Sequence, residues 1–251
     1  MPRRHHLWPL ILFFFACILF KPNYYKEGIR FYKNGEFERA AEYFQRFYNQ
    51  SPAGDSTLYY LYSCYYHLGK FERCIKILNE LASKDSPDEN VYLNLFQYYR
   101  QSRKFSELYK MLLNLKSEIL SRLDCHFPLT RTLLAEIITG ATTLRSDLEP
   151  VSYTIAKGYL TCAPDQKFYG SDTITMANFI TILDRLIPPV YPRKFFVIKS
   201  IPANSYLYLP YMRLIDQEIL KPIPELNPEA PVSISSAVQA IDRMKNKRFL
   251  K

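Results

Sequence analysis

Apolar side chains in the first half of the chain recur at helical spacing. From Phe37 they occupy offsets of 0, 3, 4, 7 and 10 residues, which lie on one face of an α-helix. The same offsets follow Phe71 and Phe105. A second apolar face precedes each of these segments, within residues 24–31, 58–65 and 92–99. The pattern predicts pairs of antiparallel helices and an all-α fold.

The helix pairs form an internal repeat. Phe37, Phe71 and Phe105 are spaced 34 residues apart. The segment Asn34–Ala40 returns as Leu68–Cys74 and again as Ser102–Leu108. One helix pair cannot bury both of its faces, so neighbouring pairs have to stack.

The period resembles that of the tetratricopeptide repeat family, whose unit is a helix–turn–helix of 34 residues. The family's signature positions are occupied here by Gly28, Phe31, Ala40, Phe44 and Pro52. The resemblance implies three such repeats within residues 21–120, stacked into a right-handed solenoid.

In this family the concave groove is lined by the first helix of each pair. The positions that the repeat pattern leaves off the core there are Tyr25, Ile29, Tyr32, Tyr59, Ser63, Tyr66, Leu93, Gln97 and Arg100. Tyrosine combines a large contact area with a hydroxyl group at low entropic cost. The resemblance therefore implies a protein-binding groove. The alternative is that some of these tyrosines pack against other parts of the chain.

Residues 121–251 lose the 34-residue period but contain a second repeat. Thr175 and Ser233 lie 58 positions apart, and a half-copy begins near Thr130. Each copy is predicted to end with a helix that the Thr or Ser caps at its N-terminus. The second and third copies place a short helix and a proline-containing loop before that cap. The sequence predicts an α-helical bundle here.

The second repeat resembles the S-layer homology family. The segments that match its motifs are Pro164–Phe168 and Thr173–Phe179. The resemblance implies a three-pronged helical bundle that holds cell-wall polysaccharide. The candidate wall-polymer residues are Thr130, Arg131, Thr175 and Ser233. The family's motif arginine is present only as Arg131, and a docking platform without polysaccharide binding is the alternative.

The N-terminus has the features of an export or anchoring segment. A basic start is followed by fourteen uncharged residues, Leu7–Phe20, whereas a membrane-spanning helix needs about 20. Residues 1–20 are predicted to be a signal peptide or membrane anchor. In one interpretation, cleavage before Cys17 leaves a lipidated cysteine. In the other, which we favour, the segment stays as an uncleaved anchor.

The remaining chemistry is sparse. The net charge of +9 favours an anionic neighbourhood, and no nucleic-acid-binding motif is present. The five cysteines show no metal-binding spacing. The sequence does not decide whether Cys64 and Cys74 form a disulfide. Cys74 and Cys162 resemble small buried apolar residues. No catalytic motif is found, and Glu136 and Glu149 have no assignable partner. We expect no enzyme, no cofactor and no metal.

Together these patterns predict a bacterial envelope scaffold, anchored to a membrane by its N-terminus with its body outside the cytoplasm. Its repeats would bind an envelope protein, and its C-terminal bundle would contact cell-wall polysaccharide or peptidoglycan. An accessory lipoprotein that acts only through protein contacts is the alternative. An envelope enzyme is the least favoured.

Overall fold

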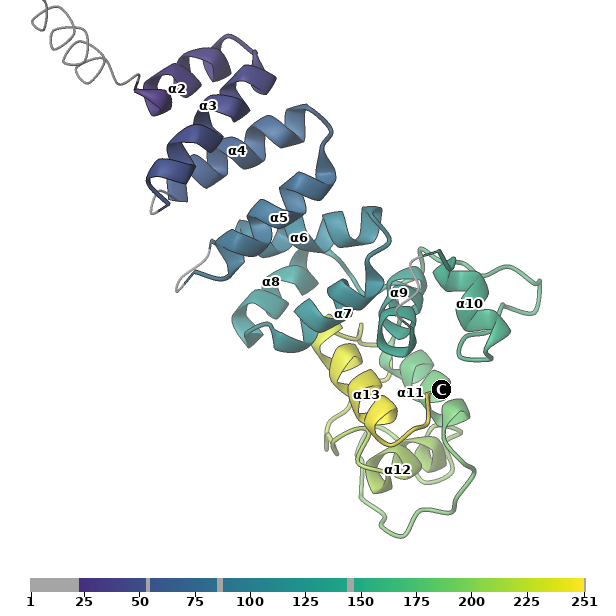
Figure 1. Ribbon diagram of the computed structural model, residues 1–251. Coiled ribbons are helices and arrows are strands. Elements are labelled where there is room, and N and C mark those ends of the chain that lie inside the picture. The colour runs from purple at the N-terminus through teal and green to yellow at the C-terminus, as the bar shows by residue number, and fades with distance from the viewer. Residues whose placement is uncertain (1–22, 53–54, 85–87, 144–146, 251) are drawn as a thin grey trace, which may run out of the picture. The chain divides into compact units, whose positions relative to one another are not determined.

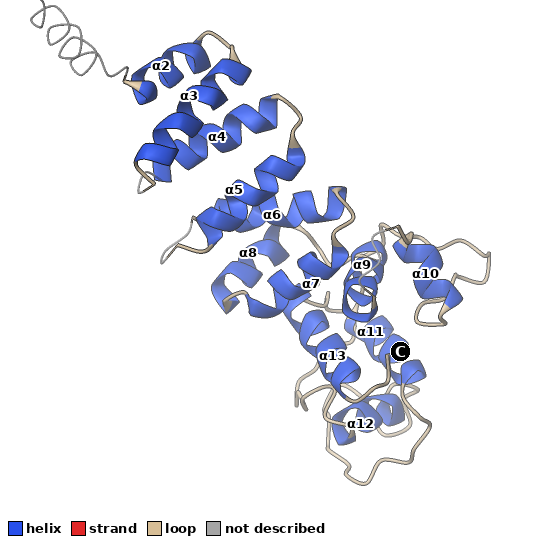
Figure 2. Cartoon of the chain, viewed as in Figure 1, coloured by secondary structure: helices blue, strands red, loops and turns tan. Residues whose placement is uncertain are grey.

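The computed structural model describes residues 23–52, 55–84, 88–143 and 147–250. The predicted leader, including Cys17, lies outside these residues. The described residues form α-helices and no strand (Figure 2), so the predicted all-α class is confirmed. The chain divides into two compact units between Val91 and Tyr92, and each unit is described separately.

Unit 1 consists of successive antiparallel helices (Figure 1). They are α2 (Tyr24–Lys33), α3 (Phe37–Gln50), α4 (Asp55–His67), α5 (Phe71–Ala82) and the first residues of α6 (Glu89–Gln101). Phe37 and Phe71, which mark the 34-residue spacing in the sequence, are the first residues of α3 and α5. The turns before them contain Gly35 and Gly69 at positive φ, a conformation that costs glycine little.

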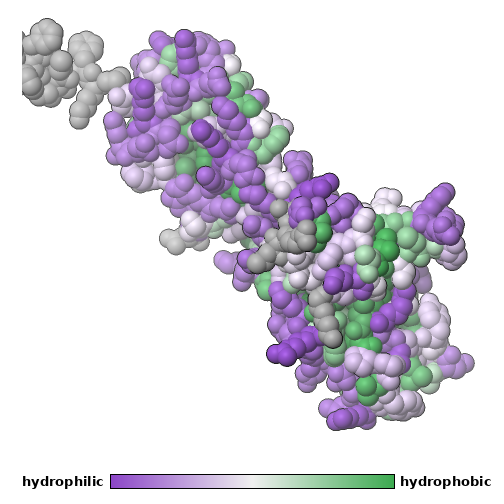
Figure 3. Space-filling view, turned by 45° about the vertical axis from the view of Figure 1, so that its right-hand side comes forward, coloured by the Kyte–Doolittle hydropathy of each residue, from purple (hydrophilic) through white to green (hydrophobic). Residues whose placement is uncertain are grey.

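The first helix pair packs closely through a glycine. A Cβ atom added to Gly28 of α2 would lie 2.8 Å from the Phe44 ring of α3. Phe44 and Ala40 are fully buried in this contact region. The small residue and the large ring at the two predicted signature positions therefore fit together. Most side chains on the visible face of unit 1 are hydrophilic (Figure 3).

Within its described residues, unit 2 contains the rest of α6 and seven further helices. They are α7 (Phe105–Asn114), α8 (Ser117–His126), α9 (Arg131–Thr142), α10 (Pro150–Ala156), α11 (Met176–Leu186), α12 (Tyr208–Asp216) and α13 (Ile234–Asn246). The central helix is α9, which is buried from Leu133 to Ala141 and packs against α7, α10 and α13. Helix α12 packs against α11.

Compactness groups the helices of the third predicted repeat with the C-terminal bundle. A Cβ atom added to Gly140 of α9 would lie 2.0 Å from the backbone oxygen of Phe105 in α7. The Tyr109 hydroxyl of α7 donates a hydrogen bond to Asp242 of α13 at 2.7 Å. These contacts tie α7 to helices that follow residue 120.

The described cysteines are free thiols. Burial raises the pKa of Cys64 to about 12 and that of Cys74 to about 11, so both are neutral at pH 7. The expectation that Cys162 is a buried residue was wrong: Cys162 is exposed because it lies in the loop that follows α10.

Candidate functional site

The first two helices of the predicted groove bring their polar groups together. The hydroxyl groups of Tyr32 in α2 and Ser63 in α4 lie 2.6 Å apart. The Tyr32 ring also packs against Tyr60, at 5.3 Å between ring centroids. Tyr25 is half-buried, with its ring 5.9 Å from that of Phe44. Tyr25 and Tyr32 thus have a packing role in addition to any binding role.

Helix α4 presents an aromatic face to solvent. Tyr59 and Tyr66 are both exposed, and Ser63 lies between them on the same face because the three residues are spaced at i, i+4 and i+7. The Tyr66 ring is 6.4 Å from that of Tyr62. Ile29 of α2 is half-buried. Tyr59 and Tyr66 are therefore the predicted groove residues of unit 1 that offer most surface to a partner.

The predicted groove residues of α6 that belong to unit 2 are placed differently from one another. Gln97 is exposed and Leu93 is half-buried. Arg100 instead donates to Glu136 of α9, with 2.5 Å between Nε and Oε2 and 3.2 Å between Nη2 and Oε1. Because Glu136 is almost wholly buried, the pairing with Arg100 neutralises its charge. This pair also supplies the partner that sequence alone did not assign to Glu136.

The three predicted caps head three helices of unit 2. Thr130 accepts from the Leu133 N–H at the start of α9 at 3.2 Å. Thr175 accepts from Asn178 in α11 at 3.4 Å, and Ser233 accepts from Ser236 in α13 at 3.0 Å. The prediction of these helix starts from the Thr and Ser positions is confirmed.

Backbone hydrogen bonds join the three capped ends. The N–H of Ile174 donates to Leu129 O, and the N–H of Val232 donates to Ile174 O, each at 2.9 Å. Each bond links the residue before a cap to the corresponding residue of the neighbouring copy. Thr130 also forms an isolated bridge with Thr173. The second repeat seen in the sequence is therefore a repeat in space, with α9, α11 and α13 starting beside one another.

In the third copy, a side chain accepts the hydrogen bond that a backbone carbonyl of a loop accepts in the other two copies. The N–H of Arg131 donates to Asp172 O and that of Met176 donates to Ala230 O. At the matching position, the Ile234 N–H donates to the Asp124 carboxylate of α8 at 2.5 Å. Burial raises the pKa of Asp124, while this hydrogen bond opposes the rise. Asp124 thus substitutes for a backbone carbonyl at the start of α13.

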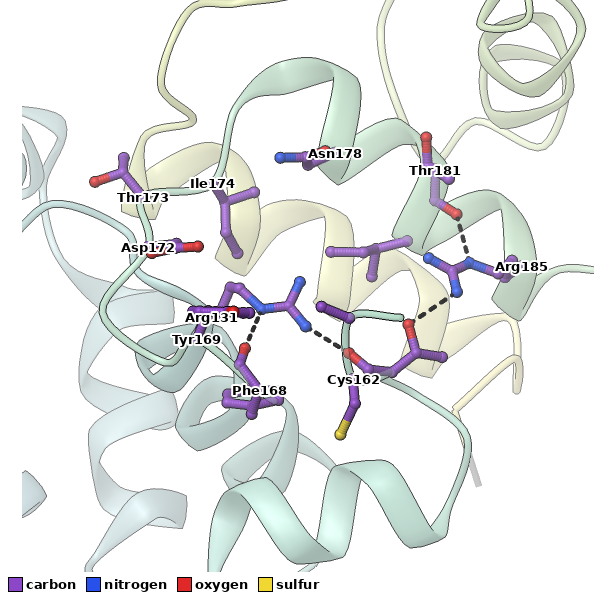
Figure 4. Close-up of a pocket in the computed structure, with 13 residues that line it drawn as sticks. Arg131, Cys162, Phe168, Tyr169, Asp172, Thr173, Ile174, Asn178, Thr181 and Arg185 are labelled. Atoms are coloured by element: carbon purple, nitrogen blue, oxygen red, sulfur yellow. Dashed lines mark hydrogen bonds between the residues drawn. The ribbon is translucent and has the colours of Figure 1, made fainter. Parts of the chain in front are cut away.

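A cavity of about 190 Å³ opens between Arg131 and α11. Figure 4 shows the Arg131 guanidinium pointing into it from the start of α9. Its Nε donates to Phe168 O at 2.8 Å, and Nη2 donates to Thr161 O. The group lies over the Phe168 ring, 4.7 Å from its centroid. Arg131 is therefore held in place by the loop and keeps further N–H groups toward the cavity.

A second cation lines the same cavity and was not selected as a site residue from the sequence. Arg185 of α11 donates to the Thr161 hydroxyl at 3.1 Å (Figure 4). Asp172 is the acidic side chain among the lining residues. Two guanidinium groups beside hydroxyl and carbonyl groups suit an anionic, hydroxyl-rich ligand. From the sequence, Arg185 next to Asp184 was interpreted as part of a structural ion pair, because nothing in the sequence indicates that it lies near Arg131.

The second cavity, of about 370 Å³, lies at the corresponding place between α11 and α13. Met176 takes the position of Arg131, and Leu226 takes that of Phe168. Arg243, which matches Arg185, donates to Ile219 O at 2.9 Å. Asp184 forms an ion pair with Arg213 of α12. The Met176 cavity is thus more apolar than the Arg131 cavity, although the two arise from the same repeat.

Among the residues that the structure describes, no group of histidine, cysteine and acidic side chains is arranged to hold a metal ion. Within the same part of the chain, no helix combines the length and the apolar character that crossing a membrane requires.

The family model described as tetratricopeptide repeat matches residues 31–95. The matched segment contains α3, α4 and α5, whose geometry is described above, and it supports a tetratricopeptide segment in this chain. The search of curated proteins gave no match. The S-layer homology resemblance of residues 121–251 stays a prediction.

Proposed function

We propose that this protein is a scaffold of the bacterial cell envelope that acts by binding and not by catalysis. Tetratricopeptide segments are interaction modules, so unit 1 supplies the contact with a protein partner. In the proposal, residues 1–20 tether the chain to a membrane, with its body outside the cytoplasm. The bundle of unit 2 contacts an anionic wall polymer. The accessory lipoprotein, which would use protein contacts alone, is the competing proposal.

The observation that carries the protein-binding part is the exposed face of α4. Tyr59 and Tyr66 lie on one side of a helix whose other side is buried through Leu58 and Leu61. Exposed tyrosines are frequent among residues that contribute most to protein interfaces. The helix is rigid, so this face is presented to a partner without an ordering cost.

Photocrosslinking in the native envelope tests this part. A photoreactive phenylalanine analogue at position 66 should give a discrete protein adduct, whereas the same group at Lys76, exposed on α5, should not. Equal adducts from both positions, or none from position 66, would reject the α4 face as the binding surface.

The observation that carries the wall-polymer part is the pair of guanidinium groups at the Arg131 cavity. Purified full-length protein should sediment with isolated wall polymer, and Arg185→Gln should reduce the bound fraction severalfold. Arg185 is the better target because Arg131 also holds the loop at Phe168 and Thr161. Lys157→Gln is the matched control, since Lys157 is exposed in the same unit. Sedimentation unchanged by Arg185→Gln would favour the accessory lipoprotein.

A further inference from the structure

The connection between α11 and α12 exposes apolar side chains to solvent. This connection, residues 187–207, is termed the aromatic loop and can be followed beneath α12 in Figure 1. Tyr191 is 73% exposed, Val197 91% and Tyr206 76%. Phe195 is also exposed. Large apolar groups gathered this densely on one loop indicate a contact surface.

The aromatic loop is held in this conformation by the body of unit 2. Ile198 and Ile201 are buried, between the exposed Val197 and the exposed Tyr206 in the sequence. The Phe196 N–H donates to Met212 Sδ at 3.3 Å, and the Tyr208 hydroxyl donates to Phe196 O at 3.1 Å. The Phe195 ring stacks on Tyr208 at 6.4 Å between centroids. These contacts hold the backbone next to Val197 in place, so Val197 and its exposed neighbours point to solvent from an ordered segment.

The charge of the loop has one sign. No acidic residue occurs between Asp184 and Asp216. Arg193 and Lys194 are exposed beside the aromatic side chains. Lys199 pairs with Glu225, which the neighbouring loop supplies, at 2.9 Å. Both of these side chains are 75% exposed, so that pair contributes little.

We propose that the aromatic loop binds an anionic phospholipid surface. Aromatic side chains favour the membrane–water interface, and nearby Lys and Arg side chains are attracted to anionic lipid. The rings of Tyr191 and Phe195 lie 5.7 Å apart between centroids, so they form one exposed aromatic cluster, and the cavities at Arg131 and Met176 are lined by other residues. Exposed aromatic side chains beside exposed basic groups suit the apolar and anionic layers of a lipid interface. The proposed contact uses residues other than those of the wall-polymer cavity and of the predicted leader.

The test places a fluorescent reporter in the full-length protein. Trp8 is the only tryptophan, so Trp8→Phe combined with Val197→Trp gives a single indole at position 197. Vesicles contain phosphatidylcholine alone or with phosphatidylglycerol, each with brominated acyl chains that quench indole emission on contact. We expect strong quenching with anionic vesicles and weak quenching with neutral ones. Any effect of the predicted leader on vesicle binding is the same in all variants, because all of them carry the same leader.

Two controls make the result specific. The indole of Trp8→Phe combined with Tyr169→Trp lies on another exposed loop of unit 2 and should stay largely unquenched. Arg193→Glu with Lys194→Glu should lower quenching at position 197 severalfold, whereas Lys157→Glu with Lys167→Glu, also exposed, should not. Absent quenching at position 197, equal quenching at both reporters, or insensitivity to the Arg193 and Lys194 reversals would overturn the proposal. The proposal would also be overturned if an added protein, but not anionic vesicles, shielded the aromatic loop from solvent.

Discussion

Within each unit, the stabilising contacts span a different range of the sequence. In unit 1, Tyr32 contacts Ser63 and Glu38 pairs with Lys70, so each bond spans about one repeat. In unit 2, Tyr109 binds Asp242 across 133 positions, and Asp124 binds Ile234 across 110. Local periodicity therefore describes unit 1 well, whereas unit 2 depends on groups that meet only in the folded bundle.

A glycine lies at a close helix crossing in each unit, and we expect the larger effect in unit 2. In Gly140→Ala, the new Cβ would meet the Phe105 carbonyl at 2.0 Å, and backbone cannot move aside cheaply. The loss should be about 3 kcal/mol or more. In Gly28→Ala the obstacle is the Phe44 ring at 2.8 Å, which can shift, so about 1 kcal/mol is expected.

Hydrogen exchange of peptides from α9 and α3 measures the two losses separately, since a two-unit chain need not unfold in one step. Equal destabilisation by the two alanines would show that backbone and ring obstruct equally.

Ion pairs give the next largest difference. Arg100→Met leaves the carboxylate of Glu136, whose side chain is 10% exposed, buried without a partner. We expect a loss of about 2 kcal/mol, below the range for wholly buried pairs because Arg100 retains some solvent contact. Lys70→Met is the control in unit 1, where Glu38 is 72% exposed. Its loss should stay within about 0.5 kcal/mol.

The measurement is the denaturant dependence of hydrogen exchange in α9 and α3. The additional change Glu136→Gln should restore part of the stability lost in Arg100→Met, because it removes the unpaired charge. No restoration would mean that the guanidinium acts by packing alone.

The smallest expected effect is a gain. Gly35 and Gly69 of unit 1 have positive φ, and Arg103 occupies the equivalent turn of unit 2 at φ 55°. Arg103→Gly should stabilise the α6–α7 turn by about 0.5–1 kcal/mol, because glycine adopts this conformation without steric cost. Slower exchange in α7 would confirm it. Faster exchange would indicate that the arginine side chain contributes more than its backbone costs.

Much of the fold followed from residue spacing alone. The recurrence of phenylalanine every 34 residues predicted the helix pairs, and these phenylalanines are the first residues of α3, α5 and α7. Thr130, Thr175 and Ser233 marked helix starts because their hydroxyl groups satisfy free N–H groups at the first turn. Arg100, predicted as a groove residue, pairs with Glu136, and its helical phase gave no sign of that buried carboxylate.

The sequence by itself determined the helix pairs, their turns and the capped helices, because these depend on apolar period and short-range hydrogen bonds. Only the tertiary structure decided that Arg185 joins Arg131 at one cavity while Met176 and Leu226 make its counterpart apolar. It also decided that the aromatic loop displays Val197 and buries Ile198. Such outcomes depend on which distant side chains compete for the same space and the same partners, and a linear pattern does not contain that competition.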